Sequence, residues 1–310
     1  MLVPESAAQA TDPRGATASS YLERGYSWAK KGEWARAIAD FNLALNFKPD
    51  YADAYHNRGV AFWKQGDFDL ALKDFDRAID LNPRLTVAYV NRGGVRYARK
   101  DLKGSLADST RAIELNPKLA QAWSNRGLVR MDLGDIAGAL ADFSRSIKLN
   151  THLAQSYVNR GVARFVQRDF AGAIADYSRA IKINPDDAQA YSSRGGVRQM
   201  NGDLEGALTD YNEAIGRNPG LADAFFSRAL LWKDKSELGK AESDMSRAIA
   251  LNPRNAQSYC YRGLLLLRQG KKDEAEKDFA QCLALDPELR ASLAERIREL
   301  NPRSGGNGTP

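Results

Sequence analysis

The stretch AQAWSNRGLVRMDLGDIAGALADFSRSIKLNTHL, residues 120–153, contains the pattern from which the fold is predicted. Each half carries apolar and small residues at the spacing of one helix face. Gly134 and Asp135 separate the halves. Glycine is favoured just beyond a helix C-terminus, and aspartate is favoured as the cap of the next helix. The stretch therefore predicts two helices joined by a short turn.

The same pattern recurs every 34 residues without an insertion. The dipeptide Arg-Gly begins at residues 24, 58, 92, 126, 160, 194 and 262, and Arg228-Ala229 occupies the remaining place. Most second helices are predicted to end at Asn-Pro, as at Asn82-Pro83, because proline cannot continue a helix. Eight repeats of 34 residues account for 272 of the 310 residues. Their ranges are 18–51, 52–85, 86–119, 120–153, 154–187, 188–221, 222–255 and 256–289.

These residues resemble the tetratricopeptide repeat family in type and spacing. At repeat positions 4, 8, 20, 24, 27 and 32, the second repeat has Tyr55, Gly59, Ala71, Phe75, Ala78 and Pro83. Ser109 and Met245 replace the aromatic residue of position 24, and Thr151 replaces a proline. The resemblance implies an all-α, right-handed superhelical solenoid of eight antiparallel helix pairs. Stacking is required because one pair cannot bury its apolar stripe alone.

The ends of the chain differ from the repeats. Residues 290–300 are predicted to form an amphipathic capping helix, with Leu293, Ile297 and Leu300 on one side. Residues 1–17 are expected to be a disordered arm and residues 301–310 a disordered tail. The arm has no apolar core of signal-peptide length, and the composition therefore predicts a cytoplasmic protein without a membrane span.

Composition excludes several function classes. Two cysteines do not make a disulfide framework, which favours a reducing compartment, and Cys282 is expected to be an inert buried thiol. His56 and His152 lie in different repeats, and no phosphate-binding glycine loop, HExxH or CxxC motif occurs. We therefore expect no enzymatic activity, no catalytic residue, no metal site and no cofactor.

Charge shows one local excess. The net charge is +6, and residues 86–119 supply seven Lys/Arg against three Asp/Glu. A single basic patch is weaker support for nucleic-acid binding than a basic stripe. Position 11 is arginine in four consecutive repeats, with no obvious acidic partner: Arg96, Arg130, Arg164 and Arg198. These side chains either cover apolar surface with their stems or meet an acidic partner.

Arginine at position 7 and aspartate at position 23 occur in all eight repeats. One interpretation is a cationic ladder for an anionic ligand. The other is a repeated ion pair between the two helices of each repeat, because a desolvated arginine needs a carboxylate. The matched counts favour the ion pair.

The side of the first helix opposite the packed face carries the candidate site. In the family that this chain resembles, this side lines a concave groove for partner peptides. Amide side chains there can bind a peptide backbone, and apolar side chains can hold its side chains. The predicted peptide-binding residues are Asn57, Asn91, Asn125, Asn159, Gln121, Gln155, Gln189, Trp63, Tyr97, Met131, Phe165 and Phe226.

The predicted function is a scaffold or adaptor that binds a protein or peptide segment in this groove. The alternative is an RNA- or polyanion-binding protein that uses the basic patch of repeat three and the position-11 arginines. A third possibility is an array that joins partners through its edges without a groove ligand. The oligomeric state is not predicted.

Overall fold

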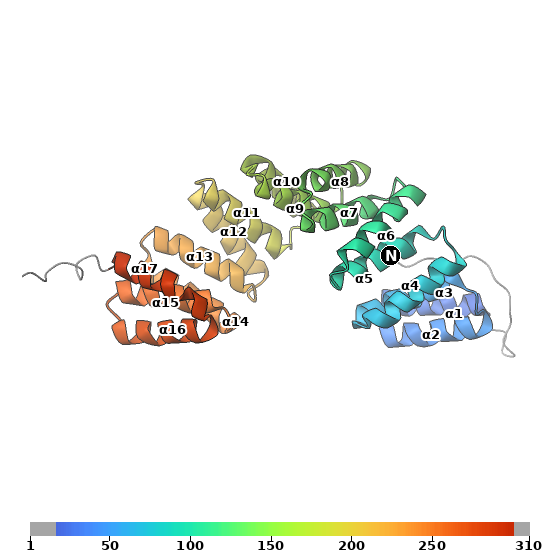
Figure 1. The fold of residues 1–310 in the computed structure, drawn as a ribbon, viewed down its shortest axis with the longest axis horizontal. Helices are drawn as coiled ribbons and strands as arrows, with labels where there is room; N and C mark the ends of the chain where they lie inside the picture. Colours follow the sequence, from blue (N-terminus) through green and yellow to red (C-terminus); the bar gives the residue numbers. More distant parts are fainter. Residues whose placement is uncertain (1–16, 301–310) are drawn as a thin grey trace, which may run out of the picture. The chain divides into compact units, whose positions relative to one another are not determined.

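The computed structural model describes residues 17–300 of the chain (Figure 1). The arm and tail predicted at 1–17 and 301–310 lie outside the described residues, apart from Thr17. Seventeen α-helices and one short 3-10 helix make up the described part. None of these helices combines the length and the apolar character that crossing a bilayer requires.

The helices follow one another in antiparallel pairs, one pair to each repeat, so the predicted all-α architecture of stacked pairs is confirmed. The first helices of the repeats are α1 (Ala18–Lys30), α3 (Ala52–Gln65), α5 (Thr86–Ala98), α7 (Ala120–Asp132), α9 (Ala154–Val166), α11 (Ala188–Met200), α13 (Ala222–Asp234) and α15 (Ala256–Arg268). The second helices are α2 (Trp34–Phe47), α4 (Phe68–Leu81), α6 (Leu102–Leu115), α8 (Ile136–Leu149), α10 (Phe170–Ile183), α12 (Leu204–Arg217), α14 (Leu238–Leu251) and α16 (Lys272–Leu285). The 3-10 helix η1 (Pro287–Leu289) leads into the capping helix α17 (Arg290–Leu300).

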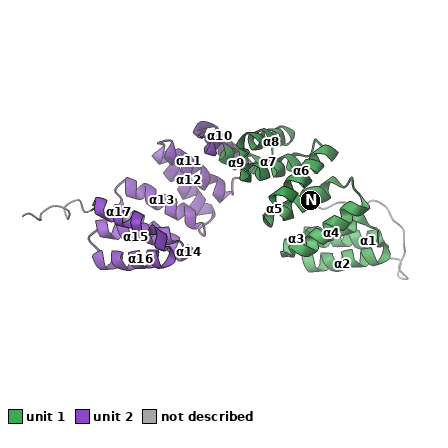
Figure 2. Cartoon of the chain, viewed as in Figure 1, with its two compact units in different colours: residues 1–163 green, residues 164–310 purple. Residues whose placement is uncertain are grey.

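The chain divides into two compact units, residues 1–163 and 164–310 (Figure 2). The division falls inside α9, near the middle of the repeat array.

The turn within each repeat needs a left-handed residue after the first helix. Gly134 takes this conformation with φ of 83°, as the sequence pattern predicts, and Asp135 then accepts a hydrogen bond of 2.9 Å from the backbone N–H of Gly138. Three repeats have Lys100, Arg168 or Ser236 at the left-handed position, with φ between 62° and 64°. The turn therefore forms even where glycine is absent, although such residues adopt this conformation less readily.

Close contact between the paired helices depends on the glycine at position 8. A Cβ atom on Gly127 would come within 2.8 Å of the Phe143 ring, so the aromatic residue of position 24 packs directly on the glycine backbone. Phe143 is fully buried. Repeat seven is different, because it has Ala229 at position 8 and Met245 at position 24. The unbranched methionine leaves room for the alanine methyl group, and both residues are fully buried.

The position-7 arginines form ion pairs with the position-23 aspartates. In repeat four, Arg126 Nε and Nη2 each donate a hydrogen bond of 2.8 Å to Asp142. The guanidinium also lies 4.8 Å from the ring of Trp123, the aromatic residue of position 4. Six other repeats have the same two-pronged pair. The remaining repeat has Arg160 and Asp176 at these positions, and the two residues belong to different compact units.

These arginines also join neighbouring repeats. Arg58 donates to Asn42 Oδ1 at 2.6 Å, and Arg228 donates to Asn212 Oδ1 at the same distance. In both cases the acceptor occupies repeat position 25 in the preceding repeat. Of the two interpretations of position 7, the repeated ion pair is therefore correct. The N–H groups of these arginines donate to aspartates of the same repeat and to side chains of the preceding repeat.

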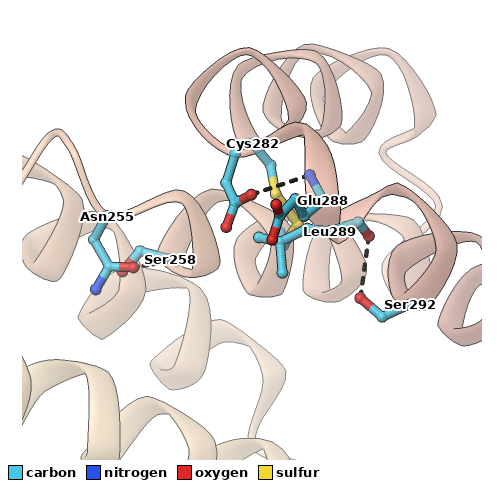
Figure 3. The surroundings of a disulfide bond; sticks show 8 residues. Asn255, Ser258, Cys282, Glu288, Leu289 and Ser292 are labelled. Carbon is cyan, nitrogen blue, oxygen red and sulfur yellow. Dashed lines mark hydrogen bonds between the residues drawn. A yellow bond between two sulfur atoms is a disulfide. The ribbon is translucent and has the colours of Figure 1, made fainter.

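The last repeat contains a disulfide bond that the sequence analysis did not predict. Cys260 on α15 and Cys282 on α16 are bonded, with their Cα atoms 5.4 Å apart (Figure 3). The prediction that Cys282 is a free buried thiol is therefore wrong. Leu293 of α17 packs in the same apolar cluster as the two cysteines. The disulfide also removes the argument from cysteine content for a reducing compartment, because such bonds persist mainly in oxidising ones.

Candidate functional site

A pocket of about 410 Å³ opens between the first helices of repeats two, three and four, all within unit 1. Trp63 of α3, Tyr97 of α5 and Leu128 of α7 supply its large apolar and aromatic surfaces. Gln121 and Asn125 of α7 supply amide groups. The other lining residues are Val60, Lys64, Val90, Asn91, Gly93, Gly94 and Ser105. We call this the repeat-three pocket.

Two departures from the repeat pattern make room for this pocket. Position 9 is Gly94, and a Cβ atom there would lie 2.8 Å from Cη2 of Trp63, so the indole ring lies across the bare backbone of α5. Position 24 is Ser109, where repeat four has Phe143. The apolar cluster that contains Phe143 packs against Leu128 and Met131, which correspond to Gly94 and Tyr97 of repeat three. Ser109 therefore places a hydroxyl group beside Gly93 where most other repeats have an aromatic ring, which reduces the side-chain volume next to this pocket-lining glycine.

The polar groups around the pocket are held in place by hydrogen bonds. Gln121 Nε2 donates to Asn125 Oδ1 at 2.7 Å, and Asn125 Nδ2 lies 3.5 Å from the carbonyl oxygen of Val90. Tyr97 donates its hydroxyl proton to Asp132 at 2.7 Å. Desolvation, together with the hydrogen bond to Asp132, raises the pKa of Tyr97 to about 12. The phenol is therefore neutral, and Lys64 is the one ionised side chain among the lining residues.

Two of the predicted asparagines are committed to a buried histidine. His56 is fully buried; its Nδ1 lies 3.1 Å from Asn57 Oδ1, and its Nε2 lies 2.9 Å from Asn91 Nδ2. Burial lowers the pKa of His56 to about 3, so the ring is neutral at physiological pH. Asn57 has no exposed surface and Asn91 only 3%. The amides of Asn57 and Asn91 therefore bond inside the stack, and Asn57 has no exposed surface with which to contact a peptide.

The other predicted residues lie apart from this pocket. Gln155 donates to Asn159, a buried residue one helical turn along α9, at 2.8 Å. Met131 packs on the Phe143 cluster. In unit 2, Phe165 contacts Phe170 with ring centroids 6.0 Å apart, and Phe226 contacts Tyr261 at 5.5 Å. Gln189 is exposed on α11. Of the twelve predicted residues, the repeat-three pocket brings together Trp63, Asn91, Tyr97, Gln121 and Asn125.

The sequence analysis did not single out the small residues that create the pocket. Gly93, Gly94 and Ser105 line it, and Ser109 lies beside Gly93. A signal was present, because repeat three alone combines glycine at position 9 with serine at positions 20 and 24. Glycine at position 9 and serine at position 24 are smaller than the residues of most other repeats, and this combination in one repeat indicates a missing volume.

The position-11 arginines are paired, contrary to the expectation that they have no acidic partner. Arg130 Nη1 donates to Asp142 Oδ2 at 2.9 Å, and its Nε lies 3.6 Å from Asp135. Arg96, Arg164 and Arg198 make the equivalent hydrogen bonds to Asp108, Asp176 and Asp210 at 2.8–2.9 Å. Arg99, in the basic patch of repeat three, pairs with Asp69. These guanidiniums are neutralised by carboxylates of the protein itself and do not form a free cationic track.

Among residues 17–300, no three or more His, Cys, Asp or Glu side chains gather in a way that could hold a metal ion. His56, the one buried histidine, bonds only amides among the contacts described above.

Comparison with solved structures gives tetratricopeptide repeat folds at low sequence identity. The structure of pilF from Pseudomonas aeruginosa matches with a TM-score of 0.62 and 20% identity, covering 68% of this chain and 96% of its own. A tetratricopeptide repeat protein from Parabacteroides merdae matches with a TM-score of 0.61 and 18% identity, covering 80% and 98%. The Cut9–Hcn1 hetero-tetramer of APC/C matches with a TM-score of 0.67 and 13% identity, covering 91% of this chain and 55% of its own. These similarities concern the fold alone.

Comparison with family models gives the same result from the sequence. Models described as tetratricopeptide repeat match residues 52–85, 256–289 and 120–152, and one described as TPR repeat matches 25–66 and 165–202. Together these segments cover more than half of the chain. No significant match was found among curated proteins. The repeat pattern, the packing of the helix pairs and these matches lead to one conclusion: the chain belongs to the tetratricopeptide repeat family.

Proposed function

We propose that this protein is a non-enzymatic adaptor that binds a partner peptide in the repeat-three pocket. Tetratricopeptide repeat proteins are generally protein-interaction scaffolds. The observation that carries the proposal is the pocket itself, which has an aromatic and aliphatic surface next to a pair of ordered amides. We expect an uncharged apolar side chain of the partner to occupy the space between Trp63, Tyr97 and Leu128.

The chemistry of the pocket supports a neutral peptide segment. Apolar pockets with a few fixed polar groups are typical of specific binding sites, because the apolar surface gives affinity and the polar groups fix orientation. Gln121 and Asn125 can each bond a peptide N–H or C=O without selecting a side chain. A volume of about 410 Å³ is enough for one large side chain and its flanking backbone.

The polyanion alternative is less well supported, because the position-11 arginines that it would use are paired with aspartates. Binding to a polyanion would have to break those pairs. The cytoplasmic location stays a prediction, and the Cys260–Cys282 disulfide weighs against it.

The test uses the full chain and a peptide library displayed on phage. Peptides selected on the wild-type protein are synthesised, and their affinities are measured by fluorescence polarisation. Ser109→Phe restores the aromatic ring that most other repeats have at position 24 and should place it against Gly93, which lines the pocket. We expect this variant to be at least as stable as the wild type and to bind the selected peptides about tenfold more weakly.

A matched pair of glycine variants provides the control. Gly94→Ala should push the Trp63 ring into the pocket and weaken binding. In Gly196→Ala, at the same repeat position in repeat six, the new methyl group meets nothing closer than 3.8 Å, and affinity should be unchanged. If Ser109→Phe and Gly94→Ala both keep wild-type affinity, the peptides bind elsewhere and the proposed site is wrong.

A further inference from the structure

A second pocket lies on the corresponding face of unit 2. Its volume is about 310 Å³, and it lies between α13, α15 and the capping helix α17. Tyr261, Leu264, Leu265 and Leu300 form its apolar surface. The charged residues that line it are Lys233, Arg268, Arg296 and Glu299. We call this the capping-helix pocket.

The two pockets use equivalent places in the repeat, which allows their chemistry to be compared. Position 12 of the preceding repeat is Trp63 in the first pocket and Lys233 in the second. Position 9 of the middle repeat is Gly94 in the first and Leu264 in the second. The third helix is α7 in unit 1, and α17 takes that place in unit 2. The indole ring of Trp63 in the repeat-three pocket is therefore replaced by the cation of Lys233 in the capping-helix pocket.

The arginines of the capping-helix pocket differ from those at positions 7 and 11 of the repeats. Within the described residues, neither Arg268 nor Arg296 has a carboxylate within ion-pair distance, whereas the position-7 and position-11 arginines are directed at aspartates. Arg296 instead lies over the ring of Tyr261, 4.8 Å from its centroid. Lys233 is 3.1 Å from Asp234, an exposed neighbour in sequence. Three cations and one carboxylate thus surround a leucine-lined hollow.

We propose that the capping-helix pocket binds an acidic peptide segment, with a leucine-like side chain inserted among Leu264, Leu265 and Leu300 and carboxylates held by Arg268 and Arg296. Charge complementarity favours this occupant, because a leucine surface alone would accept any apolar group, whereas two exposed guanidiniums with no carboxylate within ion-pair distance among residues 17–300 favour an anion beside it. The inference rests on the proposed function in one respect, namely that this face of the repeats is a recognition surface. It adds a second site of different charge, so that one chain holds two unlike peptide segments.

The test uses a fluorescein-labelled heptapeptide, Gly-Glu-Glu-Leu-Glu-Glu-Gly, and the full chain. Two analogues separate the contributions: one has glutamine in place of every glutamate, and one has alanine in place of leucine. We expect the parent peptide to bind at least about tenfold more tightly than either analogue, with an affinity that falls as salt rises. A second seven-residue series, in which the acidic residues on each side are moved one place away from leucine, tests a longer spacing between the leucine and the carboxylates.

The variants place the peptide in the pocket. Arg268→Gln with Arg296→Gln should weaken binding of the parent peptide by about tenfold or more. Arg254→Gln with Arg290→Gln removes the same charge from exposed sites that do not line the pocket, and should leave the affinity within about twofold. Circular dichroism and the melting midpoint check that the exposed substitutions leave the fold unchanged.

Several outcomes would overturn the proposal. These are equal affinity for the glutamine analogue, equal losses in the two double variants, no binding by any member of the series below about 1 mM, or self-association of the chain through this face. Loss of binding in Ser109→Phe would move the acidic peptide to the repeat-three pocket. Failure here with retained binding of neutral peptides at the repeat-three pocket would leave the proposed function standing.

Discussion

Asp142→Ala removes a carboxylate that two arginines share, and the structure gives the expected cost. The Asp142 side chain is 2% exposed and accepts hydrogen bonds from Arg126 at 2.8 Å, twice, and from Arg130 at 2.9 Å. Arg126 is 13% exposed and would lose its only carboxylate contact among those described. Arg130 is 30% exposed and keeps Asp135 within 3.6 Å. The main penalty is therefore the unpaired charge on Arg126.

Removing one partner of a buried ion pair destabilises a protein by about 3–5 kcal/mol, and the partial exposure of both arginines reduces this to about 2–4 kcal/mol. Urea unfolding followed by far-ultraviolet circular dichroism measures the change. Because repeat proteins can unfold locally, amide hydrogen exchange should show the loss concentrated in α7 and α8.

Two further variants make the result interpretable. Asp76→Ala removes the 53%-exposed partner of Arg92 and should cost no more than about 1 kcal/mol, as an exposed ion pair does. Asp142→Leu combined with Arg126→Met replaces the pair by apolar groups and should recover at least half of the loss. An unfolding midpoint of Asp142→Ala equal to that of the wild type would refute the pairing argument.

Three more predictions concern buried groups. Folded His56 has a pKa of about 3, against 6.5 when unfolded, so below pH 6.5 the unfolded chain binds the extra proton. Wild-type stability should therefore fall relative to His56→Val by up to about 1.4 kcal/mol per pH unit between pH 6.5 and 5. Parallel urea titrations in which the stability of both proteins changes equally with pH would contradict this. Reduction of the Cys260–Cys282 bond, which closes a loop of 22 residues, should lower the unfolding free energy of the last repeat by about 3 kcal/mol. Faster hydrogen exchange in α15 to α17 measures this loss. The Cys260→Ala, Cys282→Ala double variant should not respond to reductant. Ser258 has a fully buried hydroxyl oxygen without a partner among the described residues, and Ser258→Ala should raise the unfolding free energy by about 1 kcal/mol; a lower value than wild type would indicate a hydrogen bond or a bound water.

The sequence alone determined the helix pairs, because the signals that specify them act within one repeat. Glycine after the first helix, aspartate at the next helix start and proline after the second recur at fixed spacing, and each acts on its own neighbourhood. The pairing of Arg126 with Asp142 also followed from sequence, since its two residues lie 16 apart in one hairpin and both types occur in every repeat.

The candidate site was predicted only in part, because exposure depends on the neighbouring repeat. Asn91 and Asn125 occupy the same repeat position and both line the pocket, yet Asn91 is 3% exposed and bonded to His56 of the preceding repeat, whereas Asn125 is only partly buried. Which of them is available is decided by the residue at position 5 one repeat earlier. That contact spans 35 residues and appears only when the repeats stack.

Tertiary structure alone decided the remaining features, and the physical reason is distance. Two cysteines can bond only when their Cα atoms come within about 7 Å, and the hairpin brings Cys260 and Cys282 to 5.4 Å. The partners of the position-11 arginines depend in the same way on which carboxylates lie within a few ångströms. So does the lack of a carboxylate beside Arg268 and Arg296 among residues 17–300. The 34-residue pattern determined the architecture, and the packing of one repeat on the next decided which side chains are left to bind a partner.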